Sequence, residues 1–344
     1  MAVTINDIAE KANVSVSTVS RVLNNQAKKY RISKDTEKLV LKTARELNYR
    51  PNHIARGLRL KKTQTIGLVV PDISNPFFAH VTRIIQNFAY HFGYSLIVCN
   101  TDENIQTEVE QIELMRSKGV DGFIIMPVGV KYDHLEELLA DSIPLVLLDR
   151  CFDELQTNSV VVNDYKGASE AVEHLLEYGH KRIAIVQGLA NTYTNSARLR
   201  GYKDALAKYK IPLSESLIVG NDFRRENGYI ETKILLKLEK PPTAIFTTSD
   251  LITIGALQAI SEEGCKIPDD ISIVAFDDTD FAPFLSAPLT AVNQPKELMG
   301  EAAVKLLIED MKSKGQKEKK RIVLDPKLIV RNSVARITST HPDT

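Results

Sequence analysis

Apolar side chains recur three and four positions apart in the first fifty residues, which is the spacing of one face of a helix. The pattern predicts three short helices there, over residues 5–11, 15–24 and 33–47. Thr4 with Asp7 is close to a capping box before the first helix, and Ser15 or Ser17 can cap the second. Two helices joined by a tight break and supported by a third are typical of a helix-turn-helix DNA-binding domain.

The same spacing separates a buried face from an exposed one. The inward positions of the second and third helices are Val19, Val22, Leu23, Leu39, Val40, Ala44 and Leu47. The opposite face of the second helix carries Val16, Ser17, Thr18 and Arg21, which can reach base edges in the major groove. Arg21 can address a guanine or a phosphate. A generic three-helix bundle with a polar surface is the alternative.

From residue 63 onward, short apolar runs alternate with amphipathic stretches. The runs predict buried parallel strands at residues 65–70, 95–99, 122–126, 145–148, 183–187, 244–247 and 273–276. The stretches predict helices at residues 81–92, 107–117, 168–178, 199–209, 251–263 and 297–312. This alternation predicts an α/β body of two doubly wound lobes with parallel sheets.

The composition limits the class of protein. At 344 residues, with 43% hydrophobic and 26% charged residues, the chain suits two or three globular domains. No apolar run approaches the ~20 residues of a membrane span, and the N-terminus lacks the pattern of a secretory signal. The three cysteines are too few and too far apart for a disulfide framework or a zinc pattern. We therefore expect a cytoplasmic protein without a membrane segment.

The net charge of zero conceals an asymmetry along the chain. Residues 1–62 carry fourteen Lys and Arg against five acidic residues, a balance of +9. The remaining 282 residues carry thirty basic and 39 acidic residues, a balance of −9. A basic head on an acidic body suggests a polyanion such as nucleic acid as the partner of the head, although a solvated charged face is the plainer explanation.

Two runs near the N-terminus carry a fixed pattern: TINDIA followed by VSVSTVSRVLN over residues 4–24, and LNYRPN followed by ARGL over residues 47–58. They resemble the signature of the LacI/purine-repressor (LacI-GalR) family of bacterial transcription regulators. The resemblance implies that the DNA-contacting residues are Thr4, Ser15, Val16, Ser17, Thr18, Arg21, Asn24, Tyr49, Asn52, Ala55, Arg56 and Leu58.

One segment departs from the family pattern. Between Asn24 and Thr36 the chain is about three residues longer than is usual in the family, and the extra piece includes Lys28, Lys29, Tyr30 and Arg31. The two lysines can add phosphate contacts. A solvated loop is the equal alternative.

A short hinge is expected after the head. Pro51 ends the third helix and can begin a new one over residues 52–58. In the family this hinge helix pairs with that of the dimer mate in the minor groove, and Leu58 holds the place of the leucine that inserts between base steps. Packing of Leu58 on its own head is the alternative. Because so short a helix is unstable alone, its folding and DNA binding are expected to be coupled.

The body resembles the ribose-binding-protein-like, periplasmic-binding-protein fold that the same family uses as its effector domain. That fold binds a ligand between two lobes joined by three crossings, expected here near residues 160–163, 290–293 and 325–328. The predicted domains are a head over residues 1–50, a hinge and linker over 51–62, the body over 63–337 and a polar tail over 338–344. The N-lobe takes residues 63–161 and 292–325, and the C-lobe takes 162–291 and 326–337.

Candidate effector-binding residues stand at the carboxyl ends of strands, where open α/β sheets bind ligands. Matched to ribose-type proteins, they are Asn75, Phe77, Phe78, Met126, Asp149, Arg150, Arg198, Phe223, Ser249, Asp277 and Gln294. Phenylalanine faces suit the C–H surface of a sugar, carboxylates accept its hydroxyl hydrogens, and arginines donate to its oxygens. Ser249 and Met126 replace asparagines of the ribose-type pattern, so we expect a monosaccharide or similar polyol without specifying ribose.

Plainer roles remain open for several of these residues. Phe77 and Phe78 can belong to the core, and Asp277 can cap a loop. Asp250 is expected to cap the helix that it precedes. Cys151 is expected to be a small buried residue and not a redox sensor.

Three other functions compete with a sugar-controlled repressor. No phosphate loop, nucleophile elbow or His-Glu-x-x-His motif is present, so we expect no enzyme, no catalytic or metal-binding residues and no cofactor. A secreted transport receptor fits the body but not the basic head. A catabolite regulator controlled by a phosphoprotein is suggested by the segment VPDISN at residues 70–75, although such proteins usually lack the pair Asp149 and Arg150. We therefore expect a homodimeric repressor of a carbohydrate operon that binds a pseudo-palindromic double-stranded operator.

Overall fold

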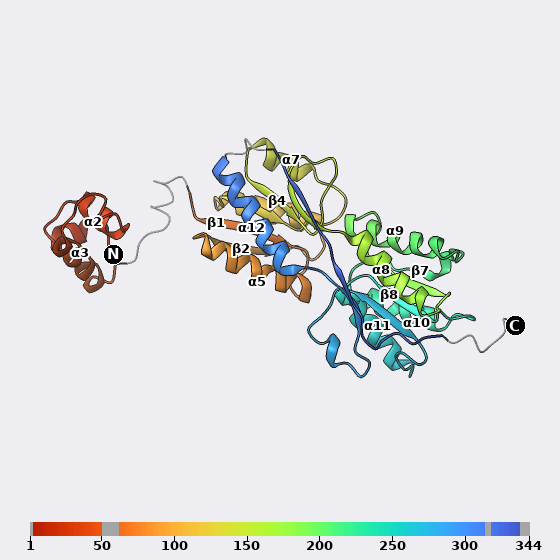
Figure 1. The fold of residues 1–344 in the computed structure, drawn as a ribbon. Helices are drawn as coiled ribbons and strands as arrows, with labels where there is room; N and C mark the ends of the chain where they lie inside the picture. The colour runs from red at the N-terminus through yellow and green to blue at the C-terminus, as the bar shows by residue number, and fades with distance from the viewer. Residues whose placement is uncertain (1–2, 50–61, 314–317, 338–344) are drawn as a thin grey trace. The chain divides into compact units, whose positions relative to one another are not determined.

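The computed structural model describes residues 3–49, 62–313 and 318–337 (Figure 1). The chain divides into two compact units, Met1–Thr63 and Gln64–Thr344, which we call the head and the body. The polar tail predicted over 338–344 and nearly all of the predicted hinge lie outside the described residues.

The head contains three helices, α1 (Ile5–Lys11), α2 (Val16–Leu23) and α3 (Lys34–Glu46). The backbone N–H and the hydroxyl of Thr4 donate to the Asp7 carboxylate at 2.7 and 2.9 Å, so the capping box is present. Ser15 caps α2 by accepting the backbone N–H of Thr18 at 3.1 Å. Capping groups of this kind satisfy the free N–H groups of short helices.

The head has a core of its own, in which Ile8, Val19, Val22 and Val40 are buried. The prediction that Leu39 turns inward is wrong, because this side chain is 46% exposed. The inward row of α3 is Val40, Thr43 and Ala44, followed by the half-buried Leu47. Leu39 precedes that row by one residue, about 100° around the helix, and falls on its exposed side.

The first lobe of the body is built on a six-stranded parallel sheet in the order β11-β5-β4-β3-β1-β2. Its strands are β1 (Thr65–Val70), β2 (Ser95–Asn100), β3 (Gly122–Ile125), β4 (Leu145–Leu148), β5 (Asn158–Val162) and β11 (Arg321–Leu324). Helices α5 (Pro76–His91) and α12 (Lys296–Ser313) pack on one face, and α6 (Ile105–Ser117) and α7 (Asp133–Ala140) on the other. Both faces are covered, which explains the continuous apolar runs in its central strands.

The second lobe repeats this plan with the order β12-β10-β9-β8-β6-β7. Its strands are β6 (Ile183–Val186), β7 (Ile218–Val219), β8 (Ala244–Thr247), β9 (Ser272–Phe276), β10 (Thr290–Asn293) and β12 (Lys327–Ile329), of which β12 alone is antiparallel to its neighbour. Its helices are α8 (Asp164–Glu177), α9 (Tyr193–Lys208), α10 (Arg225–Leu236) and α11 (Asp250–Glu262), with 3₁₀ turns at Glu215–Leu217 and Ala282–Phe284. Helices α8 and α9 cover one face, and α10 and α11 the other.

The chain crosses between the lobes three times: after β5, after β10 and between β11 and β12 (Figure 1). Two of the crossings were expected near residues 160–163 and 290–293. These stretches overlap the ends of β5 and β10, so the crossings themselves begin where those strands end. Helix α12 returns to the first lobe, where it packs beside α5. The sequence pattern missed α7 and α10.

Candidate functional site

The carboxyl ends of central strands in both lobes carry the polar residues of the candidate effector site. Asp149 directly follows β4 and Asp277 directly follows β9. Phe77 and Phe78 lie in the first turn of α5, where Asn75 caps the helix by accepting the backbone N–H of Phe77 at 2.9 Å. Ser249 is the N-cap of α11 and accepts from the backbone N–H of Ile252, so the expected capping role of Asp250 is wrong.

These side chains surround one small cavity between the lobes, of about 20 Å³. Its lining consists of Asn75, Phe77, Phe78, Asp149, Arg150, Thr194, Arg198, Phe223, Ser249, Asp277 and Gln294. The structure therefore brings together every effector residue chosen from the sequence except Met126. Thr194 was missed because α9 begins six residues earlier than its apolar pattern predicts.

Met126 does not line the cavity. Its side chain is fully buried in the core beneath α5, together with Ile66, Ile124 and Val146. It continues the side-chain alternation of β3, and that alternation directs it into the core of the first lobe. Met126 therefore lies in the core beside this cavity, and its contact with an effector stays a prediction.

Arg150 is fixed by a partner that the sequence did not reveal. Its two terminal nitrogens donate to Glu103 at 2.8 and 2.7 Å, a bidentate ion pair. Its guanidinium carbon lies 5.0 Å from the ring centroid of Phe223 and 5.9 Å from that of Phe78. The buried Nε has no hydrogen-bond partner among the described residues, but it lies 3.6 Å from Oδ2 of Asp149 in an ion pair. This nitrogen and the Asp149 carboxylate therefore face each other at the cavity wall.

Arg198 is also paired within the protein. Its Nε donates to Oδ1 of Asp164 at 2.7 Å and its Nη1 to the backbone carbonyl of Thr248 at 2.6 Å. Its guanidinium carbon lies 3.7 Å from the ring centroid of Phe276. These contacts give Arg198 a structural role at the cavity wall, and the buried Oδ2 of Asp164 keeps no hydrogen-bond partner among the described residues.

Burial changes the acidity of the carboxyl groups around the cavity. It raises the pKa of Asp149 to about 7, against the opposing attraction of Arg150. It raises the pKa of Asp164 to about 6, opposed by Arg198. Both carboxyls are charged only at the expense of desolvation. Asp277 accepts from Nε2 of Gln294 at 2.6 Å, which leaves Oε1 of Gln294 buried without a partner in the described part of the chain.

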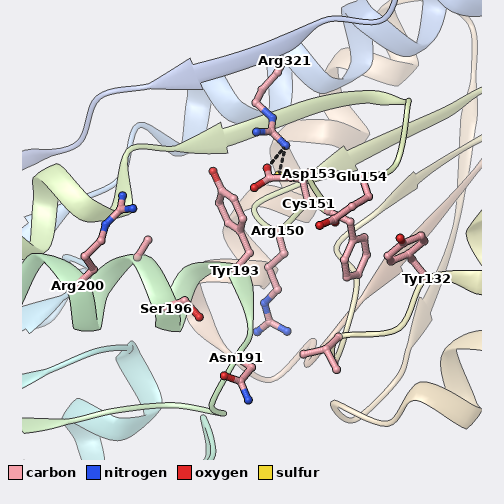
Figure 2. Close-up of a pocket in the computed structure, with 14 residues that line it drawn as sticks. Tyr132, Arg150, Cys151, Asp153, Glu154, Asn191, Tyr193, Ser196, Arg200 and Arg321 are labelled. Atoms are coloured by element: carbon pink, nitrogen blue, oxygen red, sulfur yellow. Dashed lines mark hydrogen bonds and ion pairs between the residues drawn. The ribbon is translucent and has the colours of Figure 1, made fainter.

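A larger cavity of about 570 Å³ also borders Arg150 and lies between the loop after β4 and the first turns of α9 (Figure 2). Its lining includes Tyr132, Tyr193, Arg200 and Arg321, none of which the sequence pattern selected. Arg321 pairs with Asp153 at 2.7 Å across its upper wall. A third cavity of about 350 Å³ shares Asn75, Phe78 and Phe223 with the small one.

Cys151 lies beside the larger cavity and is 4% exposed. Burial raises the pKa of its thiol to about 11. A protonated thiol is a poor nucleophile, so this environment favours the packing role over redox chemistry.

The head presents its predicted DNA-contacting residues in two ways. Val16, Ser17, Arg21, Lys28 and Lys29 are exposed. The others also support the fold: the hydroxyls of Thr4, Ser15 and Thr18 take part in helix caps, the Asn24 side chain donates to the Ser20 carbonyl at 2.6 Å, and Tyr49 packs on the head core. The hinge candidates Asn52, Ala55, Arg56 and Leu58 lie outside the described residues.

The described ranges contain neither a membrane-spanning helix nor a cluster of metal-binding side chains. No helix in residues 3–49, 62–313 or 318–337 is long and apolar enough to cross a membrane. The same part of the chain holds no group of three or more His, Cys, Asp or Glu side chains arranged to bind a metal ion.

Family models match both units. Residues 4–52 match bacterial regulatory proteins of the lacI family, and residues 172–334 match a periplasmic binding protein-like domain. The chain is 36% identical over 339 residues to the HTH-type transcriptional repressor PurR of Haemophilus influenzae, covering 97% of this chain and 99% of that one. It is 38% identical over 312 residues to catabolite control protein A of Priestia megaterium, covering 90% and 93%.

Solved structures give the same result. The lac repressor dimer bound to operator and the anti-inducer ONPF superposes with a TM-score of 0.86 at 27% identity, covering 97% of this chain and all of that one. A LacI family transcriptional regulator from Enterococcus faecium with bound ribose superposes with a TM-score of 0.71 at 33% identity, covering 80% and 100%. These matches confirm the resemblance seen in the sequence, the two-lobed fold and the reading as a regulator rather than an enzyme.

Proposed function

Because this chain belongs to the LacI family of bacterial regulatory proteins, we propose that it represses a carbohydrate-utilisation operon under the control of a small sugar or polyol. The effector binds between the lobes of the body, and the head binds a pseudo-palindromic operator as part of a homodimer in the cytoplasm. The dimeric, operator-bound lac repressor supports this assembly by analogy.

The observation that carries the sugar proposal is a set of unpaired polar atoms at the small cavity. Oε1 of Gln294 offers an acceptor and Nε of Arg150 offers a donor, and both atoms are buried without hydrogen-bond partners in the described part of the chain, although Nε also lies 3.6 Å from Oδ2 of Asp149. Leaving such groups unpaired is costly, and a polyhydroxyl ligand supplies both donors and acceptors. The rings of Phe77, Phe78 and Phe223 provide apolar faces for its C–H groups.

The size of the cavity connects binding to regulation. About 20 Å³ is room for little more than one water molecule, whereas small-molecule sites measure roughly 300–1,000 Å³. A sugar confined to this cavity therefore requires its walls, which come from both lobes, to move apart. A ligand that binds one arrangement of the lobes better than another shifts the population of arrangements, and this differential affinity is what can be transmitted to DNA binding.

A regulator controlled by a phosphoprotein remains the alternative, supported by the 38% identity to catabolite control protein A. The two proposals differ in the requirement for the cleft. A phosphoprotein docks on an outer surface and does not need the unpaired groups around Arg150 and Gln294.

A thermal-shift screen of the purified protein against a sugar and polyol library tests the effector. We expect one chemical class to raise the melting temperature by several degrees, since a ligand at a hundred times its Kd adds about 2.7 kcal/mol. Operator binding is tested separately by selecting duplexes from a random library. Equal affinity for selected and random duplexes would count against a sequence-reading regulator, whatever the outcome of the sugar screen.

A further inference from the structure

The turn between α2 and α3 places an aromatic ring against an arginine of the recognition helix. The guanidinium carbon of Arg21 lies 4.1 Å from the ring centroid of Tyr30, and Nζ of Lys29 lies 5.8 Å from the same centroid. Arg21 belongs to the last turn of α2, and both it and Tyr30 are exposed, Tyr30 by 43%. The pair therefore stands on the solvent-facing side of the head.

The backbone and two apolar anchors hold Tyr30 in place. Ala27 is 3% exposed in the head core, Ile32 packs against that core, and the N–H of Ile32 donates to the carbonyl of Ala27 at 2.9 Å. The N–H of Tyr30 donates to the carbonyl of Gln26 at 3.2 Å, and the N–H of Gln26 donates to the carbonyl of Arg21 at 2.9 Å. Apolar contacts thus hold the turn on the head core, and a backbone hydrogen bond joins it to Arg21, the residue whose side chain Tyr30 contacts.

We propose that Tyr30 is a positioning residue for operator recognition: its ring holds the Arg21 guanidinium in the orientation that contacts a base. The proposal rests on the proposed operator-binding function. A free arginine side chain samples many rotamers, and ordering it on contact with DNA opposes binding. A planar guanidinium stacked on a tyrosine ring loses much of that freedom before DNA arrives.

The charged neighbours in the same turn have a different task. Lys28, Lys29 and Arg31 are exposed and carry three positive charges beside Tyr30. Contacts between such side chains and phosphates are independent of sequence and release counterions. Removing one such contact reduces the magnitude of the salt slope, which is the slope of log K against log salt concentration, by about one. Tyr30 carries no charge. Loss of the Tyr30 side chain is therefore expected to weaken binding to the preferred operator without changing the salt dependence of that binding.

The experiment uses fluorescence anisotropy with the full-length protein, a palindromic duplex recovered from a random library, and a scrambled duplex of equal length. The variants are Tyr30→Ala, Tyr30→Phe, Arg21→Ala and the double variant Tyr30→Ala/Arg21→Ala. We expect Tyr30→Ala to bind the recovered duplex about three- to fivefold more weakly and the scrambled duplex as the parent does. Tyr30→Phe keeps the ring and is expected to bind like the parent.

The double variant and a charged control decide the mechanism. If Tyr30 acts through Arg21, the double variant binds no more weakly than Arg21→Ala alone. Lys28→Ala is expected to lower the salt slope by about one on both duplexes. Fully additive effects of Tyr30→Ala and Arg21→Ala, or equal weakening on both duplexes, overturn the proposal.

Two further outcomes keep this inference separate from folding and from the proposed function. Tyr30→Leu retains an apolar side chain without a π face, so it is expected to match Tyr30→Ala in affinity and the parent in its thermal melt. Parent-like operator affinity of Tyr30→Leu contradicts the stacking role. If the parent binds the recovered and scrambled duplexes equally well, the proposed operator-binding function is wrong, and the role of Tyr30 is wrong with it.

Discussion

Asp149 and Asp277 occupy equivalent positions in the two lobes and share an uncommon backbone conformation. Each directly follows its strand, with φ of +68° and +83°. The N–H of Asp149 donates to the carbonyl of Val160 in β5 at 2.9 Å, and that of Asp277 to the carbonyl of Val292 in β10 at 3.0 Å. The left-handed region is unfavourable for most residues and more accessible to Asp and Asn. The same backbone conformation, fixed by the same hydrogen bond to the neighbouring strand, thus directs both carboxyls to the cavity.

Replacing Asp149 by Asn is expected to weaken effector binding about tenfold or more. Asn tolerates a positive φ, so the backbone is kept, while the charge-assisted hydrogen bonds to sugar hydroxyls, worth roughly 1.5–3 kcal/mol, are lost. Titration calorimetry with the sugar found by screening measures the change. Operator affinity without effector is expected to stay at the parent value.

Asp153→Asn is the matched control for this substitution. Asp153 lines the larger cavity and is 71% exposed, so its change is expected to leave sugar affinity within twofold of the parent, on the order of the small energies of exposed groups. The reverse result, with Asp153→Asn damaging and Asp149→Asn silent, would place the effector in the larger cavity.

Arg198→Ala is expected to destabilise the body by about 3–5 kcal/mol, because it leaves the buried Asp164 carboxyl without its charged partner. Urea unfolding of the full chain measures this. Arg200, two residues along α9, is exposed and stacks on the ring of Tyr165. Its replacement by Ala is expected to cost at most about 1 kcal/mol. Similar losses for the two variants would show that the pair of Arg198 with Asp164 has no special role.

Asp149 and Asp164 are expected to contribute a fall in the stability of the body as the pH rises from 5 to 8, against the opposite contribution of the buried His174 and His180, whose pKa values are lowered. The folded pKa values of Asp149 and Asp164, about 7 and about 6, exceed the ordinary value of 3.8, so the folded state binds protons that the unfolded state has released. Their contribution is complete below the unfolded pKa and is lost as the pH rises through the folded values. Thermal melts of the parent and its variants at constant ionic strength measure this contribution.

Asp149→Asn is expected to make this pH dependence shallower, since one of the two groups no longer titrates. Glu136→Gln, an exposed change on α7, serves as the control and is expected to leave the slope unchanged. Melting temperatures of the parent and Asp149→Asn that change equally between pH 5 and 8 would contradict the raised pKa of Asp149.

The fold and most of the cavity lining could be predicted from the sequence, because strands in parallel sheets end at one edge and their following residues gather there. The partners of the two arginines could not. Glu103 stands 47 residues before Arg150, and Asp164 stands 34 residues before Arg198. Which loop approaches which strand end depends on packing that no local pattern encodes.

Met126 shows where the family pattern misled the prediction of the cavity lining. A family pattern placed it at the ligand, yet an apolar side chain at the end of β3 gains more from the core than from a polar cavity, and it is fully buried there. Strands such as β11 were also missed, because residues of β11 remain partly exposed and carry Arg321 among the apolar positions.

Gly255→Ala is expected to destabilise the body by about 3 kcal/mol or more, because helices α10 and α11 approach each other through glycines. A Cβ at Gly255 meets the carbonyl oxygen of Arg225 at 2.0 Å and the backbone nitrogen of Tyr229 at 2.6 Å, so backbone must shift. Gly93→Ala is the comparison: its φ is +79° but nothing lies within 4 Å of the added atom, and a cost of about 1 kcal/mol is expected. Equal effects in chemical denaturation would contradict tight packing of the two helices.

Removing the head is expected to leave a body that folds and binds the effector as the full chain does. Residues 64–344 form a compact unit with two sheets and their own cores, and every residue lining the small cavity belongs to that unit. Domains with separate cores fold alone. The truncated protein should therefore show the parent's sugar affinity by calorimetry and no binding to the selected duplex by anisotropy. Loss of sugar binding from a body that still melts cooperatively would mean that residues before Gln64 contribute to the effector site, and the division of labour between the basic head and the acidic body would have to be abandoned.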